Sequence, residues 1–421
     1  MEKIAVSVLF VLTYIGIILN KRHRALVIWA GIAVLLIAFP SNFIKIFGFI
    51  NWNVLGIFAG TLILADFFIY SQVPAYLSNI IINRSKNVAF AIIGVCALSS
   101  VLSIFIDNVA TLLIIAPIAI AFSKKLKLNP TYFIIGVAIC SNLQGAAILV
   151  GDAPSMILAA HEKLTFNDFF FIDGKPSVFF AIEIGAIVSM FVIYGFFRKH
   201  KETVSRLAQS EVVSWTPTVL ILVMIFALII AAFIDKDFIW LSGTICVVLA
   251  LISLVWGNSV NREETKKILK RFDWDTTLFL AGIFVMVGFL ETYNIIESIK
   301  NGIVYFTGTD VFLTYTFIVW VSIIFSAFID NVPYITAMLP VTSGMALDLG
   351  ISPFLFSFGL LIGSCLGGNI TPIGAAANVV SVGILKKEGY VTSFWTFIKL
   401  GLPFTIAATI AGYIFNWCIW R

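Results

Sequence analysis

The chain of 421 residues has very little charge for its length. Only 12% of its residues are Asp, Glu, Lys or Arg, whereas a soluble domain carries about 25%. The residues that take their place are apolar, at 60% of the chain. This balance excludes an ordinary soluble enzyme, and it also excludes a disordered chain, which needs low hydrophobicity. Lipid is the only solvent that suits this composition, and we expect an integral membrane protein.

Other kinds of chemistry are also missing. The five cysteines show no metal or redox spacing and lie in apolar runs, which is typical of buried small side chains. The three histidines fall in predicted loops, which argues against a histidine proton relay. The sequence has no Walker loop, no nucleophile–base pattern within its spans and no basic stripe with interleaved aromatics. We therefore expect no enzyme activity, no cofactor and no nucleic-acid partner.

Long apolar runs define the expected spans, because a spanning helix needs about 20 mostly apolar residues. The run from Ile4 has basic residues after it and no small-residue cleavage site, so we interpret it as the first span rather than a signal peptide. Two further runs, 88–122 and 311–346, are too long for one crossing and are interrupted by Asp-Asn, which predicts re-entrant hairpins. Two others, 131–160 and 352–385, have Gly/Asn/Pro-rich interruptions, which predicts broken helices. The simple spans are expected at 4–20, 25–39, 54–70, 178–197, 216–234, 238–256, 275–291 and 397–419.

Basic residues predict the orientation of the ten spans. With the N-terminus and C-terminus outside, most Lys and Arg residues fall on the cytoplasmic side. Only seven of the 27 remain outside: Lys3, Lys45, Lys163, Lys175, Lys236, Lys300 and Arg421. This bias supports a multi-pass protein of the cytoplasmic membrane.

The two halves of the sequence match each other. Ser-Ile-Phe-Ile-Asp-Asn-Val from Ser103 recurs as Ser-Ala-Phe-Ile-Asp-Asn-Val from Ser326, a shift of 223 positions. Each half has an odd number of crossings, so the halves must be inverted, which is a transporter architecture. We expect an all-α polytopic fold in which residues 1–200 form the first repeat, 201–215 a cytoplasmic linker and 216–421 the second repeat. Within them, 1–87 and 216–310 would be scaffold spans, and 88–200 and 311–421 would be transport elements.

The hairpin tips and the helix breaks are the expected ion and substrate site, because broken backbone inside a membrane is tolerated only where it is buried or lines a cavity. Asp107-Asn108 and Asp330-Asn331 would face each other at the tips. They are also good helix caps, and both roles can hold together. The tips are the candidate Na⁺ ligands. The full candidate set is Ser103, Asp107, Asn108, Ser141, Asn142, Gln144, Gly145, Asp152, Ser326, Asp330, Asn331, Gly367, Gly368, Asn369, Thr371 and Asn378.

The ionisable residues expected inside the spans are all acidic: Asp66, Asp107, Asp152, Glu183, Glu291 and Asp330. Without a deep Lys or Arg, a charged dicarboxylate has no partner, whereas Na⁺ or H⁺ suits carboxylate and amide oxygens. Asp152 has no counterpart in the second half, and it is either a proton carrier or the cap of a helix before Pro154. Asn142, Asn369 and Asn378 either satisfy freed backbone groups or coordinate an ion. Glu183 and Glu291 are expected near the interfaces.

These motifs resemble the ion transporter superfamily, and most of all its ArsB/NhaD permease branch. The resemblance rests on Phe-Ile-Asp107-Asn108-Val, Gly151-Asp152-x-Pro154, Asp330-Asn331-Val-Pro333 and Gly367-Gly368-Asn369-x-Thr371 with Asn378, and it covers nearly the whole chain. That branch includes arsenite permeases, NhaD-type sodium/proton antiporters, the melanosomal P protein and silicic-acid exporters; citrate-transporter-like proteins share the fold. It implies an elevator-type homodimer with ion and substrate sites at the tips and breaks.

Two departures bear on the substrate. Sodium/dicarboxylate relatives have Ser-Asn-Thr at the tips, whereas both tips here begin with Asp, which argues against a carboxylate. Gln144 and Ala147 replace a glycine and a hydroxyl residue that the branch usually has in the first break. The leading hypothesis is H⁺- or Na⁺-coupled antiport that exports a small inorganic solute such as arsenite or silicic acid. Na⁺/H⁺ antiport is the second hypothesis and sodium-coupled carboxylate symport the third.

Overall fold

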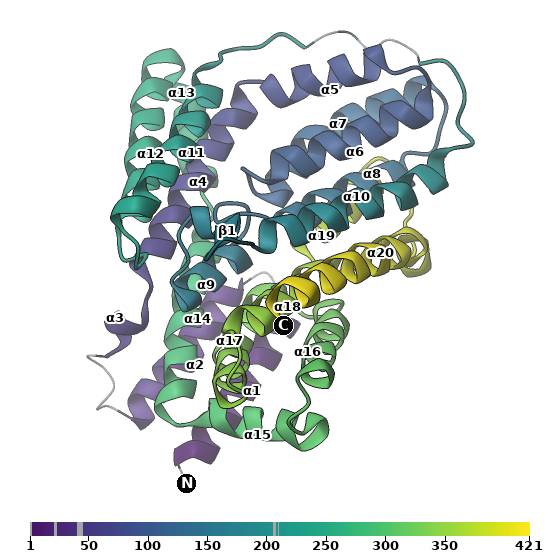
Figure 1. The fold of residues 1–421 in the computed structure, drawn as a ribbon. Coiled ribbons are helices and arrows are strands. Elements are labelled where there is room, and N and C mark those ends of the chain that lie inside the picture. Colours follow the sequence, from purple (N-terminus) through teal and green to yellow (C-terminus); the bar gives the residue numbers. More distant parts are fainter. Residues whose placement is uncertain (1, 21–22, 40–44, 205–207, 209) are drawn as a thin grey trace.

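The computed structural model describes residues 2–20, 23–39, 45–204, 208 and 210–421, and these residues are almost entirely helical (Figure 1). The described β structure is one antiparallel pair, β1 (Phe171–Ile172) and β2 (Lys175–Pro176), beside the short helix η3 (Asn167–Phe169). Apart from this pair, the described residues show the expected all-α class. Lys21, Arg22 and Arg206, which the charge argument placed on the cytoplasmic side, lie outside the described residues.

The described part of the first half contains ten α-helices up to the central linker. They are α1 (Glu2–Leu19), α2 (Arg24–Ala38), α3 (Ile46–Phe49), α4 (Trp52–Tyr70), α5 (Val73–Arg84), α6 (Val88–Ser103), α7 (Asn108–Lys125), α8 (Thr131–Gln144), α9 (Ala153–Glu162) and α10 (Val178–Phe197). The pair α6 and α7 is the first expected hairpin, with its tip at Asp107. The pair α8 and α9 is the first expected broken helix, interrupted over residues 145–152.

The second half follows the same order, with α13 in the place of the short α3. It contains α11 (Thr216–Ile234), α12 (Leu241–Val260), α13 (Arg262–Arg271), α14 (Trp274–Thr292), α15 (Ile295–Thr307), α16 (Val311–Ser326), α17 (Asn331–Asp348), α18 (Pro353–Gly367), η4 (Gly368–Ile370), α19 (Ala376–Lys387) and α20 (Phe394–Trp420). The second hairpin tip lies at Asp330, between α16 and α17. The second break lies between α18 and α19.

Nine helices within the described ranges are long and apolar enough to cross a membrane. The pair α15 and α16, bent by 115°, would make a tenth if it is counted as one bent span. The chain is therefore a polytopic membrane protein, as the composition predicts. Helix α2 is expected as a span. It has 15 residues, fewer than the roughly 20 that a helix needs to cross the bilayer.

Four α-helices lie outside the spans, hairpins and broken helices that the sequence predicts. They are α3, α5, α13 and α15, formed by residues 46–49, 73–84, 262–271 and 295–307. Helices α5 and α15 follow the third span of each half and lie toward opposite ends of the molecule, α5 at the top and α15 at the bottom of Figure 1. Each mixes polar and apolar residues, so a search for continuous apolar runs passes over them.

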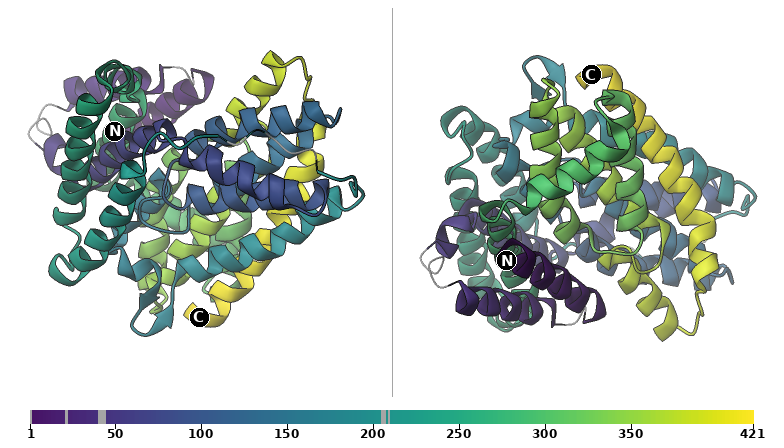
Figure 2. Two further views of the ribbon diagram at one scale, coloured as in Figure 1. Left: turned by 90° about the horizontal axis from the view of Figure 1, so that it is seen from above. Right: turned by 90° about the horizontal axis from the view of Figure 1, so that it is seen from below.

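The spans pack into two groups. In the scaffold group (α1, α2, α4, α11, α12 and α14), α4 packs along α12 and α2 packs along α14. Small residues allow the first contact, because a Cβ at Gly60 would lie 2.6 Å from the carbonyl oxygen of Cys246. In the transport group (α6–α10 and α16–α20), α10 packs along α20, α6 on α8 and α16 on α18. Both views of Figure 2 show the N-terminal helices and α20 on different sides of the molecule.

Candidate functional site

Three helices begin at aspartates in the middle of the transport group, and each aspartate caps its helix. The Asp107 carboxylate accepts hydrogen bonds from the backbone N–H groups of Val109 (3.0 Å) and Ala110 (3.1 Å) at the start of α7. Asp330 caps α17 in the same way, and Asp152 caps α9. The capping role foreseen for these residues is therefore present, and it places three carboxylates at helix N-termini.

These carboxylates line one cavity of about 300 Å³, which we call the tip cavity. Both hairpin tips reach it, and so do α4 of the scaffold and the start of α14. Five aspartates and two arginines line it: Asp66, Asp107, Asp152, Asp273, Asp330, Arg24 and Arg271. Acidic groups therefore outnumber basic groups in the cavity.

A row of amide side chains runs from the first hairpin tip to the second break. Asn108 donates to Asn142 (Nδ2 to Oδ1, 2.8 Å) and to Asp152 (Nδ2 to Oδ2, 3.2 Å). Asn142 in turn donates to Asn369 (Nδ2 to Oδ1, 3.0 Å) and to the backbone carbonyl of Cys365. The Nδ2 of Asn369 is buried without a partner among the described residues. The row thus joins the two halves and ends in an amide that is free to bind a further oxygen.

Arg24 corrects the expectation that no Lys or Arg side chain reaches the site. It is the first residue of α2, and its Nη1 lies 2.9 Å from Oδ2 of Asp330 at the second hairpin tip. The same guanidinium donates to Thr276 Oγ1 (2.6 Å), lies 3.5 Å from the Asp275 carboxylate and covers the Phe279 ring at 4.8 Å. The argument from sequence placed Arg24 in a loop, but its long side chain carries the charge away from the helix end.

The first hairpin tip has no equivalent of this ion pair. Within the described part of the chain, no Lys or Arg lies within 4 Å of the carboxylate of Asp107 or Asp152. Arg24 also lines a neighbouring cavity of about 290 Å³ beside α1, so the Arg24–Asp330 pair forms part of the wall between the two cavities.

In both breaks, a side chain donates a hydrogen bond to a glycine carbonyl on the other side of the break. Ser155 Oγ donates to the carbonyl of Gly145 across the first break (2.9 Å), and Asn378 Nδ2 donates to the carbonyl of Gly368 across the second (2.8 Å). Asn378 also donates to the Thr371 carbonyl, while its own Oδ1 is buried without a described partner. Satisfying the backbone is therefore one role of Asn378, and its free oxygen leaves room for a second.

Six of the expected site residues line the tip cavity: Asp107, Asn108, Asn142, Asp152, Asp330 and Asn331. The others lie behind it, in the breaks or at the ends of the hairpin helices. These are Ser103, Ser141, Gln144, Gly145, Ser326, Gly367, Gly368, Asn369, Thr371 and Asn378, most of which bind backbone carbonyls or let two segments approach closely. The amide of Gln144 donates to Glu183 of α10 (3.3 Å), so this departure faces α10 rather than the cavity.

The sequence argument missed the scaffold side of the cavity: Arg24, Arg271, Asp273 and Thr276. The position of two of these residues is a signal in the sequence, because Arg24 and Asp273 stand at the starts of two expected spans. Among the described residues, no three His, Cys, Asp or Glu side chains come close enough to hold a metal ion. A Na⁺ site here would therefore need amide, hydroxyl or carbonyl oxygens beside a carboxylate.

The fold and the cavity define an integral membrane protein with a polar site between broken helices, an arrangement that is typical of membrane transporters. The chain belongs to the CitMHS citrate transporter family, whose pattern matches residues 14–360. It is 30% identical over 374 residues to an uncharacterised transporter of Mycobacterium tuberculosis, covering 87% of this chain and 86% of that protein. The resemblance to the ArsB/NhaD branch of the ion transporter superfamily is thereby confirmed at the level of the superfamily.

Two further likenesses agree with this family. Over 488 residues, the chain is 26% identical to the human P protein, covering 95% of this chain and 58% of that longer protein. Among solved structures, the fold is similar to the YdaH transporter of Alcanivorax borkumensis. That match has a TM-score of 0.62 and 15% identity, and it covers 91% of this chain and 88% of the other. At this identity the likeness concerns the fold alone.

Proposed function

We propose that this chain is an ion-coupled secondary transporter that exports a small neutral or weakly acidic inorganic solute, such as arsenite or silicic acid, in exchange for H⁺ or Na⁺. One observation carries the proposal: the tip cavity is acidic, and Asp107 and Asp152 face it without an ion-pair partner among the described residues. Carboxylates at a membrane midplane are costly, and they are retained where they carry a cation or a proton.

The solute fits the amide row. Asn108, Asn142 and Asn369 carry no net charge, and Asn369 keeps an Nδ2 donor without a described partner, which suits a neutral solute with several hydroxyl groups. Asn108 and Asn142 line the same 300 Å³ cavity as the carboxylates, with Asn369 behind them, so the cation and the solute would share one space. Sharing one space gives exchange, because each ligand leaves before the other binds.

The movement in this proposal is an elevator motion of two inverted repeats. The transport group, residues 88–200 and 311–421, would slide along the scaffold group, residues 1–87 and 216–310. The recurring order of elements in the two halves supports the repeats, and the opposite placement of α5 and α15 supports their inversion. The tip cavity lies between the two groups, where such a motion would open and close it.

We place the protein in the cytoplasmic membrane with both termini outside, and we propose a homodimer held by the scaffold groups. The excess of basic residues on one side supports the orientation. Helices α11 and α12 support the dimer, because they carry many exposed apolar side chains on the outer surface of the scaffold, among them Phe226, Phe233 and Val255. Cross-linking of single cysteines on α12 in native membranes tests the dimer directly.

Two other functions have an observation in their favour. The excess of carboxylates in the tip cavity favours plain Na⁺/H⁺ antiport without a further solute. Arg24 and Arg271 favour a carboxylate substrate, which agrees with the citrate named in the family description. A citrate anion would have to compete with Asp330 for Arg24, and it would meet five aspartates in the same cavity, so we rank it below the other two.

A proteoliposome assay separates these functions. Purified protein is reconstituted with a pH-sensitive dye inside, and Na⁺, Li⁺, arsenite, silicic acid or citrate is added outside. The proposal expects proton movement that depends on arsenite or silicic acid. A response to Na⁺ or Li⁺ alone would establish cation/proton antiport, and a response to citrate alone would overturn the proposal in favour of carboxylate transport.

A further inference from the structure

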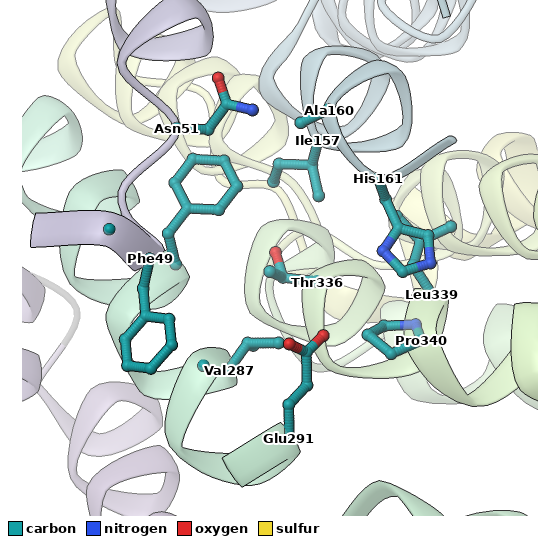
Figure 3. A pocket seen from close by; sticks show the side chains of 13 residues that line it. Phe49, Asn51, Ile157, Ala160, His161, Val287, Glu291, Thr336, Leu339 and Pro340 are labelled. Carbon is teal, nitrogen blue, oxygen red and sulfur yellow. The ribbon is translucent and has the colours of Figure 1, made fainter. Parts of the chain in front are cut away.

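A second polar cavity, which we call the far cavity, lies away from the hairpin tips and has a volume of about 240 Å³ (Figure 3). Figure 3 shows Glu291, Thr336 and His161 around the same opening, with Phe49 across from them. No described group donates a hydrogen bond to the Glu291 carboxylate. His161 corrects an expectation, because it lies in the last turn of α9 rather than in a loop. Its Nε2 is 3.1 Å from Ser343 Oγ.

The two cavities lie at opposite ends of the same pair of scaffold helices. Residues 58–69 of α4 line the tip cavity together with residues 271–276 at the start of α14. Residues 48–51, just before α4, line the far cavity together with residues 284–291 at the end of α14. Helices α4 and α14 are therefore antiparallel, and about 10–12 Å along each of them separates the two sets of lining residues, which places the two cavities toward opposite ends of this helix pair.

Two helices of the transport group also reach both cavities. Helix α9 contributes Asp152 and Ala153 to the tip cavity and Ile157, Ala160 and His161 to the far cavity. Helix α17 contributes Asn331 and Val332 to the first and Thr336 to the second. One helical turn, about 6 Å, therefore separates the lining residues along each helix. The buried Met156 lies in this turn of α9.

From this placement we infer that the far cavity is the second mouth of the transport path, open to the opposite membrane surface, and that it takes the monovalent coupling cation through Glu291. The inference rests on the proposed function, since it assumes that a cation moves through the tip site. A slide of the transport group by about one to two turns along α4 and α14 would bring the tip aspartates to the far cavity.

The charges around the far cavity suit a cation. Glu291 is the acidic group that lines it, while the nearby Glu162 is engaged, since its Oε1 accepts hydrogen bonds from Ser343 and Ser357 (2.6 Å each). No Lys or Arg is among the described residues that line it. The Glu291 carboxylate therefore acts on entering ions through its charge, over a distance of about a Debye length.

Cysteine accessibility tests the inference in sealed vesicles of both orientations. Cys418 is replaced by serine, because the other four cysteines are buried. Leu113→Cys then reports on the tip cavity, Ala160→Cys on the far cavity and Phe191→Cys, on α10, on a lipid-facing surface. The probe is a membrane-impermeant trimethylammonium thiosulfonate, and Na⁺-dependent transport is measured on the same vesicles.

We expect Leu113→Cys to react from one side, Ala160→Cys only from the other and Phe191→Cys from neither. Reaction of both cavity cysteines from the same side, or no reaction of Ala160→Cys while transport is intact, would overturn the inference and leave the proposed function standing. Intact labelling without any coupled flux would instead contradict the proposed function. Thr336→Cys repeats the test if Ala160→Cys does not fold.

A second test concerns Glu291 itself. Glu291→Gln should raise the Na⁺ concentration for half-maximal flux from the far side by about two- to fivefold at low ionic strength, and choline chloride should remove the difference. The maximal rate should stay unchanged. Glu297→Gln is the matched control, since Glu297 pairs with Lys300 on α15 away from the cavity. An equal effect of both substitutions, or none of either, would refute the role of Glu291.

Discussion

The two hairpin tips have the same sequence, Asp-Asn-Val, but different surroundings. At the second tip, Asp330 is bound by Arg24 of the scaffold at 2.9 Å. At the first tip, Asn108 joins the amide row with Asn142 and Asp152. Among the described residues, the Asp107 carboxylate accepts hydrogen bonds only from backbone N–H groups of its own helix. One tip is therefore tied to the scaffold by an ion pair, and the other presents an unpaired carboxylate to the cavity.

This difference indicates that the two tips have different roles, although the two halves have similar sequences and folds. A carboxylate that is already neutralised by an arginine gains little from a proton or a cation, whereas an unpaired carboxylate in a membrane gains much. We therefore assign the coupling charge to Asp107, with Asp152 beside it. Asp330 and Arg24 hold the second tip against the scaffold, and in the proposed elevator motion this ion pair would have to break.

The largest expected effect comes from Asp107→Asn. Asparagine still caps a helix, so the protein should fold, but the coupling carboxylate is gone. We expect coupled flux in proteoliposomes to fall at least about 100-fold, the size expected for the loss of a proton-transferring group. Asp330→Asn is the matched control, and we expect it to lower flux by less than about tenfold. Equal losses in both variants would show that the tips do the same work.

Next in size are the glycines that close the breaks. A Cβ at Gly151 would lie 2.7 Å from the carbonyl oxygen of Gly145, and one at Gly374 would lie 2.6 Å from that of Gly368. Backbone cannot yield easily, so Gly151→Ala and Gly374→Ala should each destabilise the protein by about 2–3 kcal/mol. Thermal unfolding in detergent measures this. The control is Gly195→Ala, at an open position in α10, which should change the melting temperature little. A milder effect at one break than at the other would show that the two breaks are not equally tightly packed.

Breaking the ion pair should have a smaller effect on stability. Arg24 and Asp330 are 20% and 30% exposed, so the penalty for an unpaired partner falls below that of a buried pair. Arg24→Gln should cost about 1–2 kcal/mol, and adding Asp330→Asn should recover part of it, because no lone charge then remains. A double-mutant cycle from thermal unfolding gives the coupling energy. Strict additivity would mean that the pair contributes nothing.

The smallest effect is expected at the hydrogen bonds across the breaks. Ser155→Ala and Asn378→Ala each remove a side chain that serves the carbonyl of Gly145 or Gly368. Each should destabilise the protein by about 0.5–1.5 kcal/mol. Asn378→Ala should also reduce Na⁺-dependent flux if its free Oδ1 is an ion ligand. The same loss of flux in Ser155→Ala would remove that second role.

Much of the architecture could be predicted from the sequence, because hydrophobic runs and breaks are local signals. The hairpins at Asp107 and Asp330 and the breaks after Gln144 and Gly367 appear where the interruptions in the apolar runs place them. Helices α5 and α15 could not be found in this way, since their mixed polarity matches neither a span nor a loop. The inversion and the domain division stay predictions.

The candidate site was harder to predict, because it depends on contacts between distant segments. The tips and Asn142 could be found from the repeat, and they do line the tip cavity. Arg24 lies 306 positions from Asp330, and a count of charges within spans gives no sign of their contact. Gln144 was expected at the site because it lies in a break, but the turn of α8 directs its amide to Glu183.

Proton release by the purified protein tests the central claim most directly. In weakly buffered detergent solution with a pH-sensitive dye, the coupling cation or solute found for the wild type is added, and the protons released per protein are counted. We predict release by the wild type and by Asp330→Asn, and none by Asp107→Asn. Release that persists in Asp107→Asn but disappears in Asp330→Asn would contradict the assignment of the coupling charge to the unpaired tip.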